Sequence, residues 1–159
     1  MSGYLKVATP CILLSVVMGL IACKKHHETN TTPPSPTVYV LGSSGDTTEY
    51  WKNGVATDLT DGIYDAYASS VYVSGTDVYV AGYEKNDSVY VAKLWKNGVV
   101  TNLTNGKDFA SATSVYVSGK DVYVAGVDSG ITKLRKNGKA TNLTDRTICA
   151  YTTVSVFVK

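Results

Sequence analysis

Histidine is almost absent from this chain of 159 residues, and that absence limits the chemistry available to it. The two histidines are neighbours, His26 and His27, and no histidine follows them. A Ser-His-Asp relay or a histidine-based metal centre therefore cannot be assembled from the remainder of the chain. Adjacent side chains with no third ligand nearby rarely make a selective metal site, so we expect no metal and no cofactor.

Neither sign of charge dominates, and no hydrophobic run is long enough to span a bilayer. The chain has 15 basic and 13 acidic residues in scattered order, with a net charge of +2. Because no basic stripe could neutralise a row of phosphates, we expect no nucleic-acid partner. The apolar stretch VATPCILLSVVMGLIA, at 7–22, has 16 residues and is interrupted by Pro10, whereas a spanning helix needs about 20.

This short apolar stretch is instead typical of a signal peptide, which we place at residues 1–22. Lys6 supplies a positive charge before it, and it runs into the tetrapeptide LIAC at 20–23. That tetrapeptide resembles the lipobox of bacterial lipoproteins, in which a peptidase cuts just before a cysteine that carries diacylglycerol. The resemblance implies that Cys23 is lipidated and that the lipid bilayer is a partner. The alternative is an uncleaved anchor with a chance cysteine at its end.

The cysteines and the segment after them fit an exported, anchored protein. Cys11 lies in the predicted signal peptide and Cys23 is the predicted lipidation site, which leaves only Cys149, so we expect no intrachain disulfide. Residues 23–37 are polar and contain prolines, and we interpret them as a flexible tether. Lys24 replaces the Asp that commonly marks retention in the inner membrane, so the resemblance implies an outer-membrane lipoprotein of the cell envelope.

Residues 38–159 use the vocabulary of strands and tight turns. The chain has 12 Tyr against 2 Phe, and Val, Thr, Tyr, Asn and Gly dominate this region. We therefore expect an all-β domain over 38–159.

This domain is a tandem repeat with a period of 40–44 residues. SVYVSGTDVYVAG at 70–82 returns as SVYVSGKDVYVAG at 114–126, and one slot holds Trp51, Trp95 and Arg135 in turn. The difference in length between units falls in the segment after VYVAG, which we interpret as a surface loop. In the middle unit this loop is the candidate binding loop: Tyr83, Glu84, Lys85, Asn86, Asp87 and Ser88.

Each repeat unit contains four strand candidates. In the middle unit these are 70–74, 78–82, 89–95 and 99–104. An Asn-Gly pair separates the last two in every unit and predicts a type I′ hairpin turn, at Asn53-Gly54, Asn97-Gly98 and Asn137-Gly138. Four antiparallel strands in 40–44 residues are the unit of a β-propeller blade, and the chain has about three such units.

The strand alternation predicts blades that are covered on both faces. Val and Tyr alternate at 71–73 and again at 78–80, so neither face of the sheet is polar. We interpret the Tyr series as packing between blades, the alternative being a row of platforms for stacking sugars. Arg135 indicates that its slot tolerates a charge and is partly exposed.

The motifs SVYVSG, DVYVAG, LWKNG and TNLT, in that order, resemble those of repeat-bearing lipoproteins of Gram-negative bacteria, with a looser likeness to Kelch-type blades. The resemblance covers about 120 of the 159 residues and implies a β-propeller architecture, but no particular activity.

For function we prefer a non-catalytic binding or scaffold protein that contacts a protein or glycan through rim loops of the propeller. The alternative is an exported carbohydrate-active hydrolase with a carboxylate pair. The carboxylates available for that role are Asp58, Asp61, Asp65, Asp77, Asp108 and Asp121. Most fall in turns at equivalent positions of the repeats, where their ordinary role is to bind local backbone. An enzyme needs unlike residues at equivalent positions, and the units are nearly alike, so we do not expect an enzyme.

The two ends of the repeat array are offset from each other. VYVLG at 38–42 matches strand two of a blade, and SVFVK at 155–159 matches strand one, which gives twelve strands in all. Three blades are fewer than the usual minimum of four. The offset leads to the hypothesis of a homodimer, in which two chains joined head to tail complete a six-bladed ring. The alternative is an incomplete propeller, the truncated relic of a longer array, which the degenerate RTICAYTTV stretch at 146–154 favours.

Overall fold

A computed structural model describes residues 35–145 and 154–159, which form one compact unit from residue 35 onward. These residues are all-β and contain no helix, as the sequence predicts. Among them there is accordingly no helix long and apolar enough to cross a membrane. The signal peptide, Cys23, the tether through residue 34 and Cys149 lie outside the described residues.

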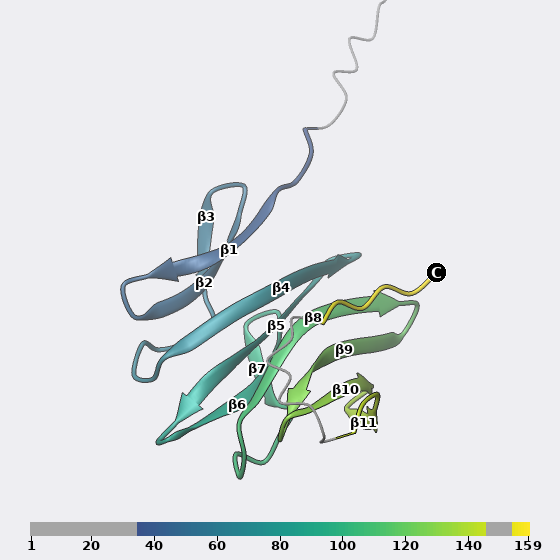
Figure 1. The fold of residues 1–159 in the computed structure, drawn as a ribbon. Helices are drawn as coiled ribbons and strands as arrows, with labels where there is room; N and C mark the ends of the chain where they lie inside the picture. The colour runs from purple at the N-terminus through teal and green to yellow at the C-terminus, as the bar shows by residue number, and fades with distance from the viewer. Residues whose placement is uncertain (1–34, 146–153) are drawn as a thin grey trace, which may run out of the picture. The chain divides into compact units, whose positions relative to one another are not determined.

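In the part of the chain that the structure describes, eleven strands form three antiparallel sheets, each in the order of an incomplete or complete propeller blade (Figure 1). The first sheet has the order β1 (Tyr39–Ser44), β2 (Thr47–Lys52), β3 (Val55–Asp58). The second has the order β4 (Ala66–Ser74), β5 (Asp77–Asn86), β6 (Val89–Lys96), β7 (Val99–Asn102). The third consists of β8 (Ala110–Ser118), β9 (Asp121–Asp128), β10 (Ile131–Lys136) and β11 (Lys139–Asn142). The first sheet thus contains strands two, three and four of a blade.

The repeated KNG motif closes the hairpin between strands three and four and also ties it to strand two. In the second sheet Asn97 and Gly98 have φ values of 52° and 81°, the left-handed conformation that a type I′ turn requires. The Asn97 side chain accepts a hydrogen bond from Val78 N at 2.9 Å and donates one to Asp77 at 2.9 Å. Lys96 forms an ion pair with Asp77 at 2.8 Å. The motif is therefore part of the scaffold, and the same backbone contacts recur at Asn53 and Asn137.

The motif TDLT or TNLT, written T[DN]LT, at 57–60, 101–104 and 141–144, prolongs the pairing of strand four with strand three beyond the end of strand four. In the second sheet Leu103 N donates to Ala92 O at 2.8 Å, and the hydroxyl of Thr104 accepts from Ala92 N at 3.1 Å. Equivalent bonds are made by Leu59 and Thr60 in the first sheet and by Leu143 and Thr144 in the third. The hydroxyl of the final Thr thus takes the place of a backbone acceptor where the ladder with strand four ends.

The second sheet is buried on both faces. Its Val face, with Val78, Val80 and Trp95, packs with Leu59 of the first sheet. Its other face, with Tyr79 and Ala81, packs on the third sheet through a group that includes Ala110, Ala112, Val115, Val117 and Val124. The alternation of Val and Tyr along β5 therefore builds two cores, one with each neighbouring sheet.

Two glycines mark the places where strand one bulges against strand two. The pairing of β4 with β5 shifts register between Ala68 and Ser70, and a Cβ added at Gly82 would overlap the carbonyl oxygen of Tyr67. The same bulge occurs in β8, where Gly126 approaches the carbonyl oxygen of Ser111. The Gly of VYVAG is required because backbone fills the space that a side chain would need.

The candidate loop at 83–88 is mostly strand, which differs from our expectation. β5 continues to Asn86 and pairs with β6 from Val89 onward, so that only Asp87 and Ser88 form the turn. Asp87 has a φ of 52°. The longer unit therefore extends a hairpin by added cross-strand pairs.

The segment 154–159 lies beside β8 without belonging to a sheet (Figure 1). Thr113 donates from its hydroxyl to Val154 O at 2.6 Å, and Val156 N donates to the hydroxyl of Ser114 at 3.1 Å. The segment therefore runs next to strand one of the third sheet, and the twelfth strand expected at 155–159 is not formed among the described residues.

Candidate binding grooves between the sheets

Two grooves occupy equivalent positions between successive sheets. The first groove, between the first and second sheets, has a volume of about 460 Å³ and is lined by Asp58, Leu59, Thr60, Asp61, Tyr64, Glu84 and Val100. The second groove, between the second and third sheets, has a volume of about 560 Å³. Its wall includes the repeat equivalent of every residue in the first: Asn102, Leu103, Thr104, Asn105, Asp108, Asp128 and Ala140. The repeat thus produces the same hollow twice.

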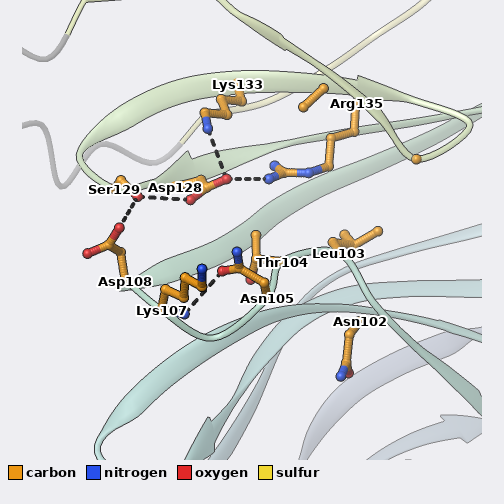
Figure 2. Close-up of a pocket in the computed structure, with 12 residues that line it drawn as sticks. Asn102, Leu103, Thr104, Asn105, Lys107, Asp108, Asp128, Ser129, Lys133 and Arg135 are labelled. Carbon is orange, nitrogen blue, oxygen red and sulfur yellow. Dashed lines mark hydrogen bonds and ion pairs between the residues drawn. The ribbon is translucent and has the colours of Figure 1, made fainter.

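The third-sheet wall of the second groove carries a partly buried cluster of charges (Figure 2). Asp128 at the end of β9 accepts hydrogen bonds from Lys133 at 3.0 Å and from Arg135 at 2.7 Å. Arg135 is only 3% exposed, which corrects the expectation that its slot is partly open. In the second sheet Trp95 fills the same slot at 1% exposure. A cation is tolerated there because Asp128 neutralises it.

The charges of this cluster shift the titration of Asp128. Its partial burial acts to raise the pKa of the carboxyl group. The hydrogen bond from Lys133 and the charges of Lys133 and Arg135 outweigh burial, and the pKa lies below its usual range. Asp128 therefore remains a carboxylate at neutral pH and holds both cations in the groove wall.

The opposite wall comes from the segment that links β7 to β8. Asn105 accepts a hydrogen bond from Lys107 N at 3.1 Å through its side-chain oxygen, which fixes a local turn. Asp108 accepts one from the hydroxyl of Ser129 at 2.9 Å and so connects the two walls (Figure 2). Among the described residues the ammonium group of Lys107 has no ion pair. The groove thus presents fixed amide, hydroxyl and charged groups.

The two grooves differ in charge although they share a backbone. The first groove is lined by three carboxylates, Asp58, Asp61 and Glu84, and by no cation, although Glu84 forms an ion pair with Lys93 outside the lining. In the second groove the equivalents of Asp58 and Asp61 are amides, Asn102 and Asn105. Three cations and two carboxylates then give that lining a net charge of +1. The two hollows therefore have similar backbones but linings of different charge.

A cluster of aromatic rings lies beside the second groove. Tyr83 stacks on Tyr67 with ring centroids 5.4 Å apart and meets Tyr90 edge-on at 5.2 Å. Tyr90 in turn contacts Phe109 at 5.6 Å, and Phe109 follows Asp108 of the groove wall. Tyr67 and Phe109 are exposed. Burial, with the nearby Tyr67 and Tyr90, raises the pKa of Tyr83, so the Tyr83 hydroxyl stays protonated at physiological pH.

The structure disperses the residues of the candidate binding loop. Tyr83 belongs to the aromatic cluster, Glu84 lines the first groove, and Lys85 forms an ion pair with Asp65 at 3.6 Å. Asp87 and Ser88 form the turn at the end of the hairpin. The alternation of side chains along β5 sends neighbouring residues to opposite faces, so these five residues do not form one surface.

Of the carboxylates considered for a hydrolase, only Asp58 and Asp61 share a groove, and the others are dispersed. Asp77 is held by Lys96 and Asn97, and Asp121 by Lys136 and Asn137. Asp58 and Asp61 line the first groove, Asp108 lines the second, and Asp65 pairs with Lys85. Within the described ranges no group of three or more His, Cys, Asp or Glu residues could hold a metal ion.

Reasoning from the sequence did not identify the second groove as a site. The sequence could have indicated this site only through positions at which equivalent residues of the repeats differ, such as Asp61 and Asn105 or Trp95 and Arg135. These positions are far apart along the chain and meet only when the sheets stack.

No protein-family model matches the chain, and the comparison with curated proteins found no significant match. The grooves and the exposed faces of the sheets are therefore the basis for the functional argument.

Proposed function

We propose that the chain is a non-catalytic binding lipoprotein of the outer membrane, anchored through acylated Cys23, and that it binds an acidic glycan in the second groove. The observation that carries the proposal is the divergence of two equivalent grooves on a repeated scaffold. Two hollows with the same backbone but different charge are expected if only one of them binds an acidic ligand.

The chemistry of the second groove favours a glycan over a protein. Protein interfaces depend on large apolar anchors inserted into desolvated pockets, whereas Leu103 is the one large apolar residue of this lining. Amides, hydroxyls and charged groups are suited to hydrogen bonds with sugar hydroxyls. The net charge of +1, with Lys107 lacking an ion pair among the described residues, favours a sugar that carries a carboxylate.

The same groove offers little for catalysis. Its two carboxylates are already engaged, Asp128 by Lys133 and Arg135, and Asp108 by Ser129. A glycosidase needs one carboxyl group that is protonated at working pH, but the pKa of Asp128 is lowered by its cations. The groove thus supports binding without turnover.

The test is an array of neutral and uronate-containing oligosaccharides probed with the detergent-solubilised lipoprotein. We expect retention of uronate glycans. The substitutions Lys107→Ala and Asn105→Asp should each weaken binding about tenfold, because each removes or opposes a charge-assisted contact. Asn105→Asp should preserve the fold, since Asp61 makes the same turn in the first groove by accepting from Ile63 N at 3.0 Å.

The matched control is Asp61→Asn, which changes the equivalent residue of the other groove and should leave retention unchanged. Retention of protein ligands only, or uronate binding that neither substitution in the second groove affects, would contradict the proposal. Release of shortened oligosaccharides, detected by mass spectrometry, would overturn its non-catalytic part.

A further inference from the structure

The segment 154–159 occupies the position of strand one in a fourth blade. Val115 N of β8 donates to the hydroxyl of Ser70 on β4 at 3.2 Å. One repeat further on, Val156 N donates to the hydroxyl of Ser114 on β8 at 3.1 Å. The segment therefore lies against β8 in the register in which β8 lies against β4.

A row of aromatic rings follows the same register. Tyr72 and Tyr116 have ring centroids 4.6 Å apart, and Tyr116 and Phe157 have theirs 5.2 Å apart. These residues occupy the same place in SVYVS, SVYVS and SVFVK. Two independent contacts thus identify 155–159 as the next strand one.

This strand one has no strand two among the described residues. In the second and third sheets strand one is paired with strand two, as β4 with β5 and β8 with β9. Residues 154–159 enter no sheet, and Phe157 is 75% exposed. Within the described ranges, the backbone groups on the far side of the segment belong to no ladder.

The first sheet has the complementary deficiency. Its edge strand β1 is a strand two with no strand one beside it in the described chain. Val38 and Val40 are exposed, whereas their repeat equivalents Val78 and Val80 are buried against the first sheet. The open face of the first sheet is thus a surface that the repeat covers elsewhere with another sheet.

The Leu of the T[DN]LT motif indicates which sheet would cover the open face of the first sheet. Leu59 of the first sheet is 7% exposed and packs on Val78 and Val80 of the second. Leu103 of the second sheet packs toward the third. Leu143 of the third sheet is 54% exposed. This leucine therefore has no following sheet to pack on in the described chain.

We propose that two copies of this chain assemble head to tail into a closed dimer, in which 155–159 of each copy pairs with β1 of the other. The register of β4 with β5, where Val71 faces Val80 and Val73 faces Val78, places Val156 opposite the partner's Val40 and Val158 opposite the partner's Val38. Leu143 then packs on the partner's first sheet. Residues 155–159 cannot pair with β1 of their own chain. β1 contacts β4 and β4 contacts β8, so the second sheet lies between the two open edges.

Pairing along a strand edge and packing of an apolar face act together in this interface. The ladder satisfies the open backbone groups of two edges that would otherwise invite uncontrolled association. A two-fold arrangement uses both open ends of each copy, so assembly stops at two chains and six blades.

Sedimentation of the full lipoprotein in a density-matched non-ionic detergent tests the oligomeric state. We expect a dimer at micromolar concentration. Leu143→Asp should raise the dissociation constant at least about tenfold, and because Leu143 is exposed the folded monomer should persist with an unchanged circular dichroism spectrum. The control Val55→Asp, at an exposed position of β3, should leave the dimer intact. A monomeric wild-type protein, or an open-ended series of species, would overturn the proposal.

Disulfide trapping tests the register independently of stability. Chains carrying Val40→Cys and chains carrying Val156→Cys are mixed and oxidised, and we expect a covalent heterodimer because directly opposed residues of antiparallel strands have Cβ atoms about 5 Å apart. Val55→Cys in place of Val40→Cys should give only the background that the native cysteines produce in the wild-type chain. Equal yields from the two mixtures would contradict the register. Neither assay depends on the glycan groove, so its failure would leave the proposed function untouched.

Discussion

Arg135 donates a hydrogen bond to Asp128 at 2.7 Å from a slot that a fully buried tryptophan fills in the preceding sheet. The change from Trp95 to Arg135 takes apolar packing from this wall and adds a charge that only a neighbouring carboxylate makes tolerable. A polar wall in the second groove is the result.

Removing the carboxylate should expose the cost of burying this cation. We expect Asp128→Asn to lower the free energy of unfolding by about 3 kcal/mol, because Arg135 is left buried without a counter-charge. The comparison variant is Glu84→Gln at the equivalent position of the second sheet, where the carboxylate pairs with Lys93 alone and the slot holds Trp95. Its cost should be smaller, about 2 kcal/mol, because one lysine loses its partner instead of a lysine and an arginine. Urea denaturation of both variants measures the difference, and equal losses would contradict it.

The free energy of unfolding should also fall in acid, because three carboxyl groups have lowered pKa values in the folded protein. The hydrogen bond from Lys96 lowers the pKa of Asp77, and the hydrogen bond from Lys136 lowers the pKa of Asp121. The cations beside Asp128 lower its pKa against the effect of burial. A carboxyl group with a lowered folded-state pKa contributes stability above its unfolded value of about 3.9, and the contribution disappears as pH falls through the folded-state value.

Thermal unfolding across pH 2 to 7 checks this dependence. We expect a plateau above about pH 5 and a decline below pH 4, with Asp128→Asn showing a shallower decline than the wild type. An identical slope for the two proteins would mean that Asp128 does not contribute.

The Asn-Gly turns should be sensitive to shape and insensitive to nearby charge. Gly98 has a φ of 81°, so Gly98→Val forces a β-branched side chain into the left-handed region and should cost about 1 kcal/mol or more. Lys96→Ala removes an exposed ion pair with Asp77 and should cost less than about 1 kcal/mol. Melting temperatures distinguish the two, and equal values would argue against the strained turn.

Two glycines of the second sheet should differ sharply in their tolerance of a methyl group. Gly82→Ala places a Cβ onto the carbonyl oxygen of Tyr67, and we expect a loss of about 3 kcal/mol or failure to fold. Gly75→Ala meets nothing within 4 Å at a φ of 61°, so only backbone strain of about 1–2 kcal/mol applies. Chemical denaturation of the pair separates close packing from conformational strain, and similar losses would contradict the close approach at the bulge.

The anchoring proposal has its own test at Cys23. Cys23→Ala should leave an uncleaved or soluble species and shift the protein out of the membrane fraction, because no thiol remains to accept the diacylglycerol. Fractionation followed by metabolic labelling with a fatty-acid probe measures both effects. A variant that the probe still labels would refute lipidation at Cys23.

The sequence by itself determined the strands, the hairpins and their grouping into sheets. Alternation along 71–73 and 78–80 has a period of two, and each sheet pairs strands that are neighbours in sequence, so local information was sufficient. The prediction of a loop at 83–88 was wrong only in the length of the loop. Glu84, Lys85 and Asn86 are residues typical of turns, but they continue the pairing of β5 with β6.

Contacts between sheets were decided only by tertiary structure. The second groove brings Asn105 and Asp128 together from two different sheets. The burial of Arg135 depends on Asp128, a carboxylate seven residues away in the sequence. The position of 154–159 beside β8 depends on the hydroxyl groups of Thr113 and Ser114, which are more than 40 residues away in the sequence. A local pattern can predict which face of a strand is apolar, but the stacking of the sheets determines what that face meets.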